Sequence, residues 1–487
     1  MDSNRADSKT TAPLWAAFVA AALTAAAAWF SYTVQPVWWL AWVAPIPVFA
    51  YAVRAGRLAA FIVGAVGCFI GVMSWWPFLH DRLNAPAIAI VGAVVPAALA
   101  FGIACLVLRT FARRGFVAAA PFATAAFWTA FSWLGSVTSI NGSGGNIGYS
   151  QMDFLPAIQI AALGGVHAIG FLLILFAASV AVLFAPVAEI VRRNAAVVGL
   201  GVVMLALLAG TWRVNDTVEP SLKVAALAID DPGPKLVPKA TTPEGEALLA
   251  RYVDAVAATA RQGAKIVLIP ENVVTIEDGD EAAFETRFRE AAKANAVDIV
   301  VGAGRYTAGP NWNLAYVFKA DGGEAQKYTK RHLVPGFERQ FTPGEGEPFV
   351  SDAASGRWGV SICKDLDFPE YQRTYGAAGV GLLVVPAWDF VQDAWLHNRT
   401  AVLRGVENGF AMLRTARNGL LTVTDDRGRV LASVASASAP VASLVANAPT
   451  TYRPTLYTRI GDTFSYVAMA AFLLLLAWLF VDGRKRV

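Results

Sequence analysis

The sequence predicts a membrane helical bundle of about eight spans joined to one α/β domain. The first observation is composition, because 56% of the residues are hydrophobic and only 16% are charged, which is too apolar for an ordinary soluble protein. The second is that apolar runs of roughly 20 residues, the length that crosses a bilayer, recur along the first part of the chain. The third is a stretch of ordinary globular composition, 214–462, which is well within the size of one domain.

The apolar runs define the membrane segments. Seven predicted spans occupy a transmembrane domain over 1–213, and the eighth lies in 463–487 with a basic tail behind it. The first run could be mistaken for a signal peptide, but more spans follow it, which favours an uncleaved anchor. The eight expected spans are 12–31, 36–53, 58–80, 87–109, 117–136, 157–187, 195–213 and 463–481.

Basic residues predict the orientation of these spans, because Lys and Arg are enriched in cytoplasmic loops. Every basic cluster falls on the same side of an eight-span arrangement, and the alternate loops carry only Arg82. We therefore expect both termini in the cytoplasm and 214–462 outside it. The clustered residues are Arg5, Lys9, Arg54, Arg57, Arg109, Arg113, Arg114, Arg192, Arg193, Arg484, Lys485 and Arg486.

The segment 214–462 alternates strand-like and helix-like patterns, which predicts a layered α/β domain with a mixed sheet. Two hairpins are expected, one starting at 313 with its turn at 321–323 and one over 410–432 with its turn at 425–428. An Ala/Ser/Val-rich tract, 431–448, is expected to hold a strand and a loop leading back to the membrane. The expected strands are 222–229, 265–270, 298–303, 357–362 and 381–386, and the expected helices are 244–262, 280–295 and 393–408.

Three reactive side chains follow strand-like runs. Cys363 comes directly after the run 358–362, Glu271 after 265–270, and Lys330, in the segment 328–332, after another strand. A thiol at the end of a buried strand is held rigidly and is still reached by substrate. A carboxylate, an amine and a thiol placed in this way could together form a nucleophilic site.

Several other kinds of site are not indicated. A net charge of +4 gives no reason to expect nucleic acid as a partner. The three cysteines lie in different segments and the four histidines are scattered, so neither a disulfide framework nor a metal site is expected. We expect no cofactor.

The three segments resemble the Glu-Lys-Cys triad of the nitrilase (carbon-nitrogen hydrolase) superfamily, which implies an αββα sandwich. The membrane half is similar to the apolipoprotein N-acyltransferase branch. That similarity is carried by Trp75-Trp76, Asn146 to Gln151, Gly164 to Leu173, and Tyr457 to Asp462 just before the last span. The chain departs from the branch at Lys364-Asp365, where Tyr-Glu is usual, at Gly336-Phe337, where the two are exchanged, and in the arm 230–243, which lacks the usual tryptophan.

The resemblance implies a reaction and its partners. The acyl chain comes from a membrane phospholipid, passes through a thioester on Cys363, and goes to the α-amino group of a diacylglyceryl-cysteine lipoprotein in a ping-pong sequence. We expect Glu271 to act as base and Lys330 to stabilise the oxyanion. Glu338, Lys364, Asp365 and Trp388 are expected to support the site or bind substrate; Trp388 could also be a core or membrane-interface residue. The expected location is the bacterial inner membrane, with the catalytic domain facing the periplasm, as a monomer.

Two alternatives remain open from the sequence. One is a membrane-anchored amidase or nitrilase with the same triad, in which water replaces the amine; Lys364-Asp365 favours it slightly. The other is a transporter or receptor whose outward domain only binds. Eight spans are compatible with transport, but no charged residue lies convincingly inside a span, where an ion relay would need one.

Overall fold

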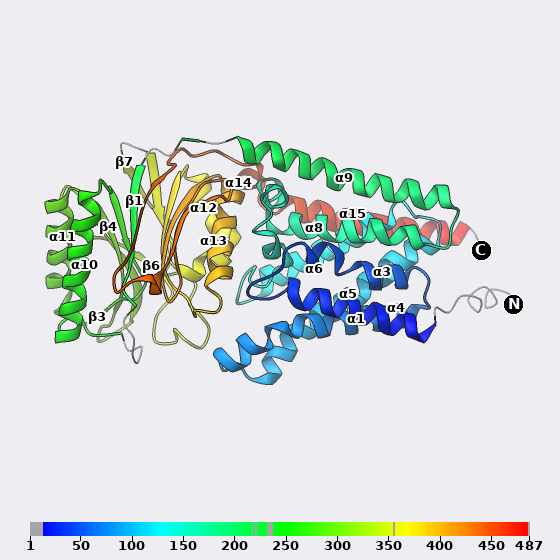
Figure 1. The fold of residues 1–487 in the computed structure, drawn as a ribbon, viewed down its shortest axis with the longest axis horizontal. Helices are drawn as coiled ribbons and strands as arrows, with labels where there is room; N and C mark the ends of the chain where they lie inside the picture. The colour runs from blue at the N-terminus through cyan, green and yellow to red at the C-terminus, as the bar shows by residue number, and fades with distance from the viewer. Residues whose placement is uncertain (1–12, 217, 220–221, 231–236, 354–355, 486–487) are drawn as a thin grey trace. The chain divides into compact units, whose positions relative to one another are not determined.

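The computed structural model describes residues 13–216, 218–219, 222–230, 237–353 and 356–485, with side chains as far as residue 481. The chain divides into two compact units (Figure 1). Unit 1 comprises 1–139, 143–215 and 462–487, and unit 2 comprises 140–142 and 216–461. Arg5, Lys9, Arg486 and part of the 230–243 arm lie outside the described residues, as do the side chains of Arg484 and Lys485.

Unit 1 is built from helices, as its composition predicts. Six helical segments of the described chain are long and apolar enough to cross a membrane: Leu14–Ser31, Arg57–Arg82, Ala87–Arg113, Ala161–Phe184, Glu189–Asn215 and Thr463–Val481. They contain α1 (Leu14–Ser31), α4 (Arg57–Val72), α5 (Ala87–Arg113), α8 (Ala161–Ala181), α9 (Glu189–Asn215) and α15 (Thr463–Lys485).

Six of the eight expected spans meet this criterion, and the other two, 36–53 and 117–136, are also helical. The expected span 36–53 is two short helices, α2 (Leu40–Val43) and α3 (Ile46–Ala52), because Ala44 and Pro45 separate them. The expected span 117–136 forms a 19-residue helix, α6 (Ala120–Thr138), which is diluted by Thr, Ser and Gly residues and is not among the six. Short helical turns, η3 (Ile147–Gln151) and α7 (Leu155–Ile158), precede α8.

Helix α8 is broken near its start. Gly164 and Gly165 have non-helical backbone angles, and Gly165 has φ +67° and ψ −170°, a conformation that only glycine adopts freely. Gly164 also lies against the ring of Phe464 on α15, where a Cβ atom would fall 2.6 Å from a ring carbon. Gly165 therefore permits the break, and Gly164 permits the close approach of α15.

Unit 2 contains two mixed sheets. The first has the order β13-β1-β2-β4-β5-β6, with β3 paired to β4, and the second has the order β12-β11-β10-β9-β8-β7. The first sheet's strands are β1 (Leu222–Ala228), β2 (Ile266–Ile269), β3 (Thr275–Ile276), β4 (Asp298–Arg305), β5 (Trp312–Phe318), β6 (Gln326–Thr329) and β13 (Ala442–Ala448). The second sheet's strands are β7 (Phe349–Ala353), β8 (Gly356–Val360), β9 (Leu382–Trp388), β10 (Ala411–Arg417), β11 (Leu420–Thr424) and β12 (Val430–Ala435).

The sheets pack face to face and helices cover their outer faces (Figure 1). Helices α10 (Pro243–Arg261) and α11 (Glu281–Asn295) cover the first sheet, and α12 (Pro369–Ala377) and α13 (Ala394–Asn408) cover the second. Apolar side chains of both sheets form one core between them, and a second core lies under α10 and α11. This is the αββα sandwich that the resemblance implies.

The structure extends the sequence-based strand assignments. The expected hairpin over 410–432 is three antiparallel strands, because Asn418 and Gly419 turn the chain between β10 and β11 before the expected turn at 425–428. The tract 431–448 ends in β13, which pairs with β1 along its whole length, rather than in a loop. Strand β7 and helix α12 were not expected from the sequence.

Candidate active site

Three strand ends bring the expected reactive groups together. Glu271 follows β2, and Lys330 directly follows β6, both in the first sheet. Cys363 follows β8 in the second sheet. Because the two sheets face one another, side chains that leave them at the same end meet between the layers.

Lys330 and Glu271 form a buried ion pair. The Lys330 Nζ atom lies 2.7 Å from Glu271 Oε1 and 2.8 Å from Glu338 Oε2. The side chains of Lys330 and Glu271 are 1% and 3% exposed, so the amine and both carboxylates interact with little water between them. Glu338 thus holds the lysine from a second side, and the Val334 N–H donates to Glu338 at 2.6 Å.

Asn313 links the two carboxylates and was not expected from the sequence. Its Nδ2 atom donates to Glu271 Oε1 and to Glu338 Oε1, each at 2.7 Å. Asn313 is 1% exposed within the otherwise apolar strand β5. A buried amide in such a strand was a usable signal, because buried polar side chains need partners.

Glu271 keeps one oxygen atom for chemistry. Oε1 accepts from both Lys330 and Asn313, whereas the buried Oε2 atom has no hydrogen-bond partner among the described residues. Burial raises the pKa of Glu271 above its usual value, and the nearby Glu338 carboxylate adds to this, while Lys330 opposes it. A carboxylate with an open oxygen and a raised pKa is suited to accepting a proton.

Cys363 has an unusual backbone conformation. Its φ angle is +44°, in the left-handed region, where non-glycine residues are uncommon and mark strain or function. The residue opens a helical turn, Cys363–Asp367, and its Sγ atom lies 3.9 Å from the Trp388 carbonyl oxygen.

Burial and the neighbouring charges determine the protonation state of the Cys363 thiol before substrate binds. Burial raises the pKa of Cys363 well above its ordinary value, and Glu271 raises it further, while Lys330 opposes the increase. The pKa of Lys330 is raised despite burial, because Glu271, Cys363 and Glu338 all favour its charged form. The resting site therefore holds a neutral thiol beside an ammonium group, and the thiol must lose its proton when it attacks.

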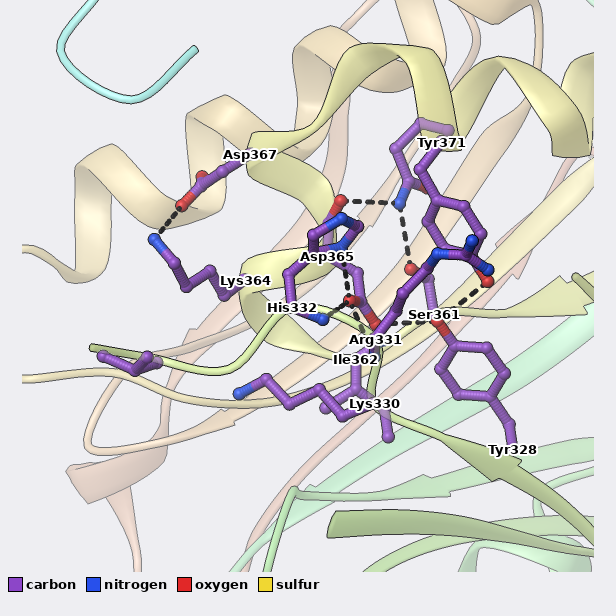
Figure 2. A network of polar contacts seen from close by, with 12 residues as sticks. Tyr328, Lys330, Arg331, His332, Ser361, Ile362, Lys364, Asp365, Asp367 and Tyr371 are labelled. Atoms are coloured by element: carbon purple, nitrogen blue, oxygen red, sulfur yellow. Dashed lines mark hydrogen bonds and ion pairs between the residues drawn. The ribbon is translucent and has the colours of Figure 1, made fainter. Parts of the chain in front are cut away.

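Asp365 joins the lysine segment to the cysteine segment (Figure 2). Its Oδ1 atom accepts the backbone N–H of Arg331 at 3.1 Å and of His332 at 2.7 Å. Its Oδ2 atom accepts the Tyr328 hydroxyl at 2.7 Å and the Ile362 N–H at 3.2 Å. Because these donors flank Lys330 and Cys363, one buried carboxylate sets the distance between the two segments.

The remaining expected supporting residues lie differently. Figure 2 shows the Lys364 amine beside Asp367, 3.5 Å from its Oδ2 atom, and the amine donates to Asn141 Oδ1 at 2.8 Å. These partners differ from those of Lys330, which are Glu271 and Glu338. Trp388 is partly buried at the end of β9, and the Arg417 guanidinium carbon lies 4.1 Å from its ring centroid.

A buried charged cluster beside Trp388 was also missed. Arg414 donates to Asp389 at 2.6 and 3.0 Å, and His397 lies 3.1 Å from Asp393 and 3.6 Å from Asp389. Arg414 is the only charged residue between Ala411 and Ala416 of strand β10, a pattern that signals a buried partner.

Comparison with known protein families gives two matches that follow one another along the chain. Residues 13–179 match the apolipoprotein N-acyltransferase N-terminal domain, and residues 223–461 match the carbon-nitrogen hydrolase family. The second match contains Glu271, Lys330 and Cys363, and the first ends within α8.

Named relatives cover both units. An apolipoprotein N-acyltransferase of Geobacter metallireducens is 25% identical over 88% of this chain and 89% of its own length. One from Vibrio vulnificus is 24% identical over 96% of each chain. A chloroplastic omega-amidase of Arabidopsis thaliana is 32% identical over 29% of this chain and 47% of its own length. Among solved structures, an amidase from Nesterenkonia is 21% identical, with a TM-score of 0.40 over 51% of this chain and 97% of its own.

Proposed function

Because the chain belongs to the apolipoprotein N-acyltransferase family, a membrane branch of the carbon-nitrogen hydrolase superfamily, we propose that it moves a fatty acyl chain from a phospholipid to a lipoprotein. The acyl chain travels as a thioester on Cys363. The acceptor is the N-terminal amine of a diacylglyceryl-cysteine lipoprotein. The observation that carries this proposal is the buried contact of Lys330 with Glu271 and Glu338, at a site whose thiol is Cys363.

The first half-reaction forms the thioester. The Cys363 thiol proton passes to the open Oε2 atom of Glu271 as Sγ attacks the carbonyl carbon of the phospholipid ester. The oxyanion that forms is stabilised by the Lys330 ammonium group, which Glu271 and Glu338 hold in place. When the intermediate collapses, the ester C–O bond breaks and Glu271 returns the proton to the leaving alcohol.

The second half-reaction reverses these roles. The incoming amine attacks the thioester carbonyl, and Glu271 accepts the proton that the amine loses. Lys330 again stabilises the oxyanion. The C–S bond then breaks, the sulfur recovers the proton from Glu271, and the product is an amide.

The proposed placement is a catalytic domain on the periplasmic side of the bacterial inner membrane. The domain occupies 214–462, between the helices of 1–213 and the last span in 463–487. The support is the one-sided distribution of basic residues in the eight-span arrangement. A domain there has access to phospholipid esters and to the lipidated ends of exported proteins.

The direct test is to capture the acyl-enzyme. Purified protein is mixed with a phospholipid carrying a labelled acyl chain, and the peptide containing Cys363 is examined by mass spectrometry. We expect one acyl group on Cys363, released as an amide when a diacylglyceryl-cysteine peptide is added. Cys363→Ala should carry no label and Cys363→Ser almost none, since a hydroxyl is far harder to ionise. Label on the alanine variant would place the nucleophile elsewhere, and release only as free fatty acid would favour the hydrolase alternative.

A further inference from the structure

Arg417 lies at the end of β10, where it contacts both halves of the candidate site. Its Nη1 atom donates to the Asn272 carbonyl oxygen at 3.0 Å. Asn272 directly follows Glu271 and has φ +51°, so the chain turns sharply just after the proposed base. This contact crosses from the second sheet to the first, because β10 and β2 belong to different sheets.

The same side chain holds the segment that faces the thiol. The Arg417 guanidinium lies over the Trp388 ring, 4.1 Å from its centroid, and the Trp388 carbonyl oxygen lies 3.9 Å from Cys363 Sγ. The Arg417 carbonyl oxygen accepts the N–H of Asp389 at 2.9 Å. The Arg417 side chain therefore contacts the Trp388 ring, and the Arg417 main chain holds the N–H group that follows the Trp388 carbonyl group.

The residues around Arg417 make this arrangement rigid. Arg414, three residues earlier in β10, binds both oxygens of Asp389. Asn418, the next residue, donates its N–H to Asp230 Oδ2 at 2.9 Å, just beyond β1 of the first sheet. The end of β10 is thus anchored to both sheets at the level of the candidate site.

We propose that Arg417 is a positioning residue that braces the Glu271 segment against the Trp388–Cys363 segment. The guanidinium suits this role because its planar face stacks on an indole while its edge donates hydrogen bonds. The positioning role of Arg417 depends on the proposed function only for the identity of the acyl donor. Its effect on the thiol does not depend on that donor.

The effect should be large because the transfer of a proton between two side chains depends steeply on geometry. A displacement of about 1 Å at a reacting group can cost on the order of 100-fold in rate. We therefore expect Arg417→Met to lower the rate of thioester formation by about 100-fold. The phospholipid concentration that gives half the maximal rate should not change, because Arg417 acts on the enzyme's own groups rather than on substrate.

The test uses two readouts on the full-length protein. The first is the rate at which iodoacetamide alkylates Cys363, followed by mass spectrometry of its peptide, which requires no lipid substrate. The second is thioester formation from labelled phospholipid. We expect Arg417→Met to slow both, and Arg417→Lys, which keeps a cation that can reach the Asn272 carbonyl oxygen, to recover much of each rate.

The matched control is Arg429→Met, which removes an arginine from the β11–β12 turn, where it pairs with Asp425. It should alkylate and acylate as the parent does. If Arg417→Met proves unfolded by its thermal melting profile, Arg417→Gln replaces it, since the amide keeps a donor but not the stacked cation. Alkylation at the parent rate in a folded Arg417→Met or Arg417→Gln variant overturns the proposal. Alkylation of Arg417→Lys no faster than that of Arg417→Met also overturns it. Failure of the parent itself to take acyl groups from phospholipid would sink the proposed function while leaving the alkylation comparison intact.

Discussion

A φ angle of +44° at Cys363 costs roughly 1–3 kcal/mol for a side chain with a Cβ atom, so the surrounding contacts must enforce it. Asp365, two residues later, supplies much of that enforcement by accepting the Ile362 N–H and the Tyr328 hydroxyl. The result is a main chain at Cys363 that cannot relax without disturbing buried hydrogen bonds. Strain at the nucleophile is thus balanced by a carboxylate that takes no part in the proposed proton transfers.

The roles of Glu271 and Lys330 can be separated by substitutions of similar shape. Glu271→Gln removes the proton acceptor, and Lys330→Met removes the charge that stabilises the oxyanion. Each should slow thioester formation by on the order of 10²–10⁴-fold, and the losses need not add. The rate of Cys363 acylation by labelled phospholipid is the measurement.

Arg331→Met is the control for Lys330→Met. Its side chain donates to the Gly346 carbonyl oxygen and lies over Tyr371, and its backbone contact to Asp365 survives the change. Arg331→Met should slow thioester formation far less than Lys330→Met does. If it is as slow as Lys330→Met, or if Glu271→Gln acylates normally, the assignment of the three groups is wrong.

The pKa of Glu271 predicts how acylation responds to acid. Because burial and Glu338 raise that pKa above the usual 4.5, the carboxylate gains a proton at a higher pH than a free glutamate does. Acylation should therefore decline as the pH falls, and the decline should begin above pH 4.5. The measurement is the initial rate of acylation against pH. Glu338→Gln removes one cause of the increase and should move the decline to lower pH; an unchanged profile would contradict the coupling.

At the scale of elements, the site depends on strand ends and on the loops that follow them. Sequence reasoning could find Glu271, Lys330 and Cys363 because each follows an apolar run that reads as a strand. It could not find Asn313, Asp389 and Arg414 with the same ease, since their partners come from other strands and only the packed sheets bring them together. The missed strand β7 is short and half exposed, so it lacks the apolar run that reveals a buried strand.

The first turn of α13 contains a histidine, His397, whose charge should influence stability. Burial lowers the pKa of His397, but Asp393 and Asp389 outweigh it and raise the value to about 9. A histidine with a raised folded pKa stabilises the fold below its unfolded pKa of about 6.5, and this stabilisation is lost as the pH rises through about 9.

We therefore expect the melting temperature of the parent to fall between pH 6.5 and pH 9 more than that of His397→Gln, by a few degrees. Melting followed at several pH values in the same detergent is the measurement. Parallel curves for parent and variant would show that His397 carries no such linkage. The ion pair of Asp389 with Arg414 should persist over this range, since an arginine stays charged.

At the scale of the whole molecule, composition predicted a membrane unit and a separate α/β unit, and the structure divides the chain in that way. The continuity of the helices was harder to predict, because 36–53 reads as one apolar run but Pro45 lies between two short helices. Hydropathy alone does not register such a break. It also does not register the break in α8 at Gly164 and Gly165, because the segment Ala161–Phe184 is still strongly apolar.

The proposed topology makes a prediction about labelling. The background is Cys363→Ser, and the first test variant is Glu324→Cys, at an exposed position on the turn between β5 and β6. This cysteine should react with a membrane-impermeant thiol reagent in cells whose outer membrane is permeabilised and whose inner membrane is intact. A cysteine in place of Arg193, whose side chain is 68% exposed, should react only after the cells are lysed. The reverse pattern would place 214–462 in the cytoplasm.

The contact between Gly164 of α8 and Phe464 of α15 has a consequence for biosynthesis. Phe171 and Phe464 pack edge to face, Phe127 packs on Phe472, and the Trp133 indole donates to Asp462 at 3.0 Å, so α6 and α8 acquire these partners only from the end of the chain. The ribosome must therefore synthesise all of unit 2 before α15 can pack on α6 and α8. Until then, we expect the faces of α6 and α8 that contact Asp462, Phe464 and Phe472 to lack these partners.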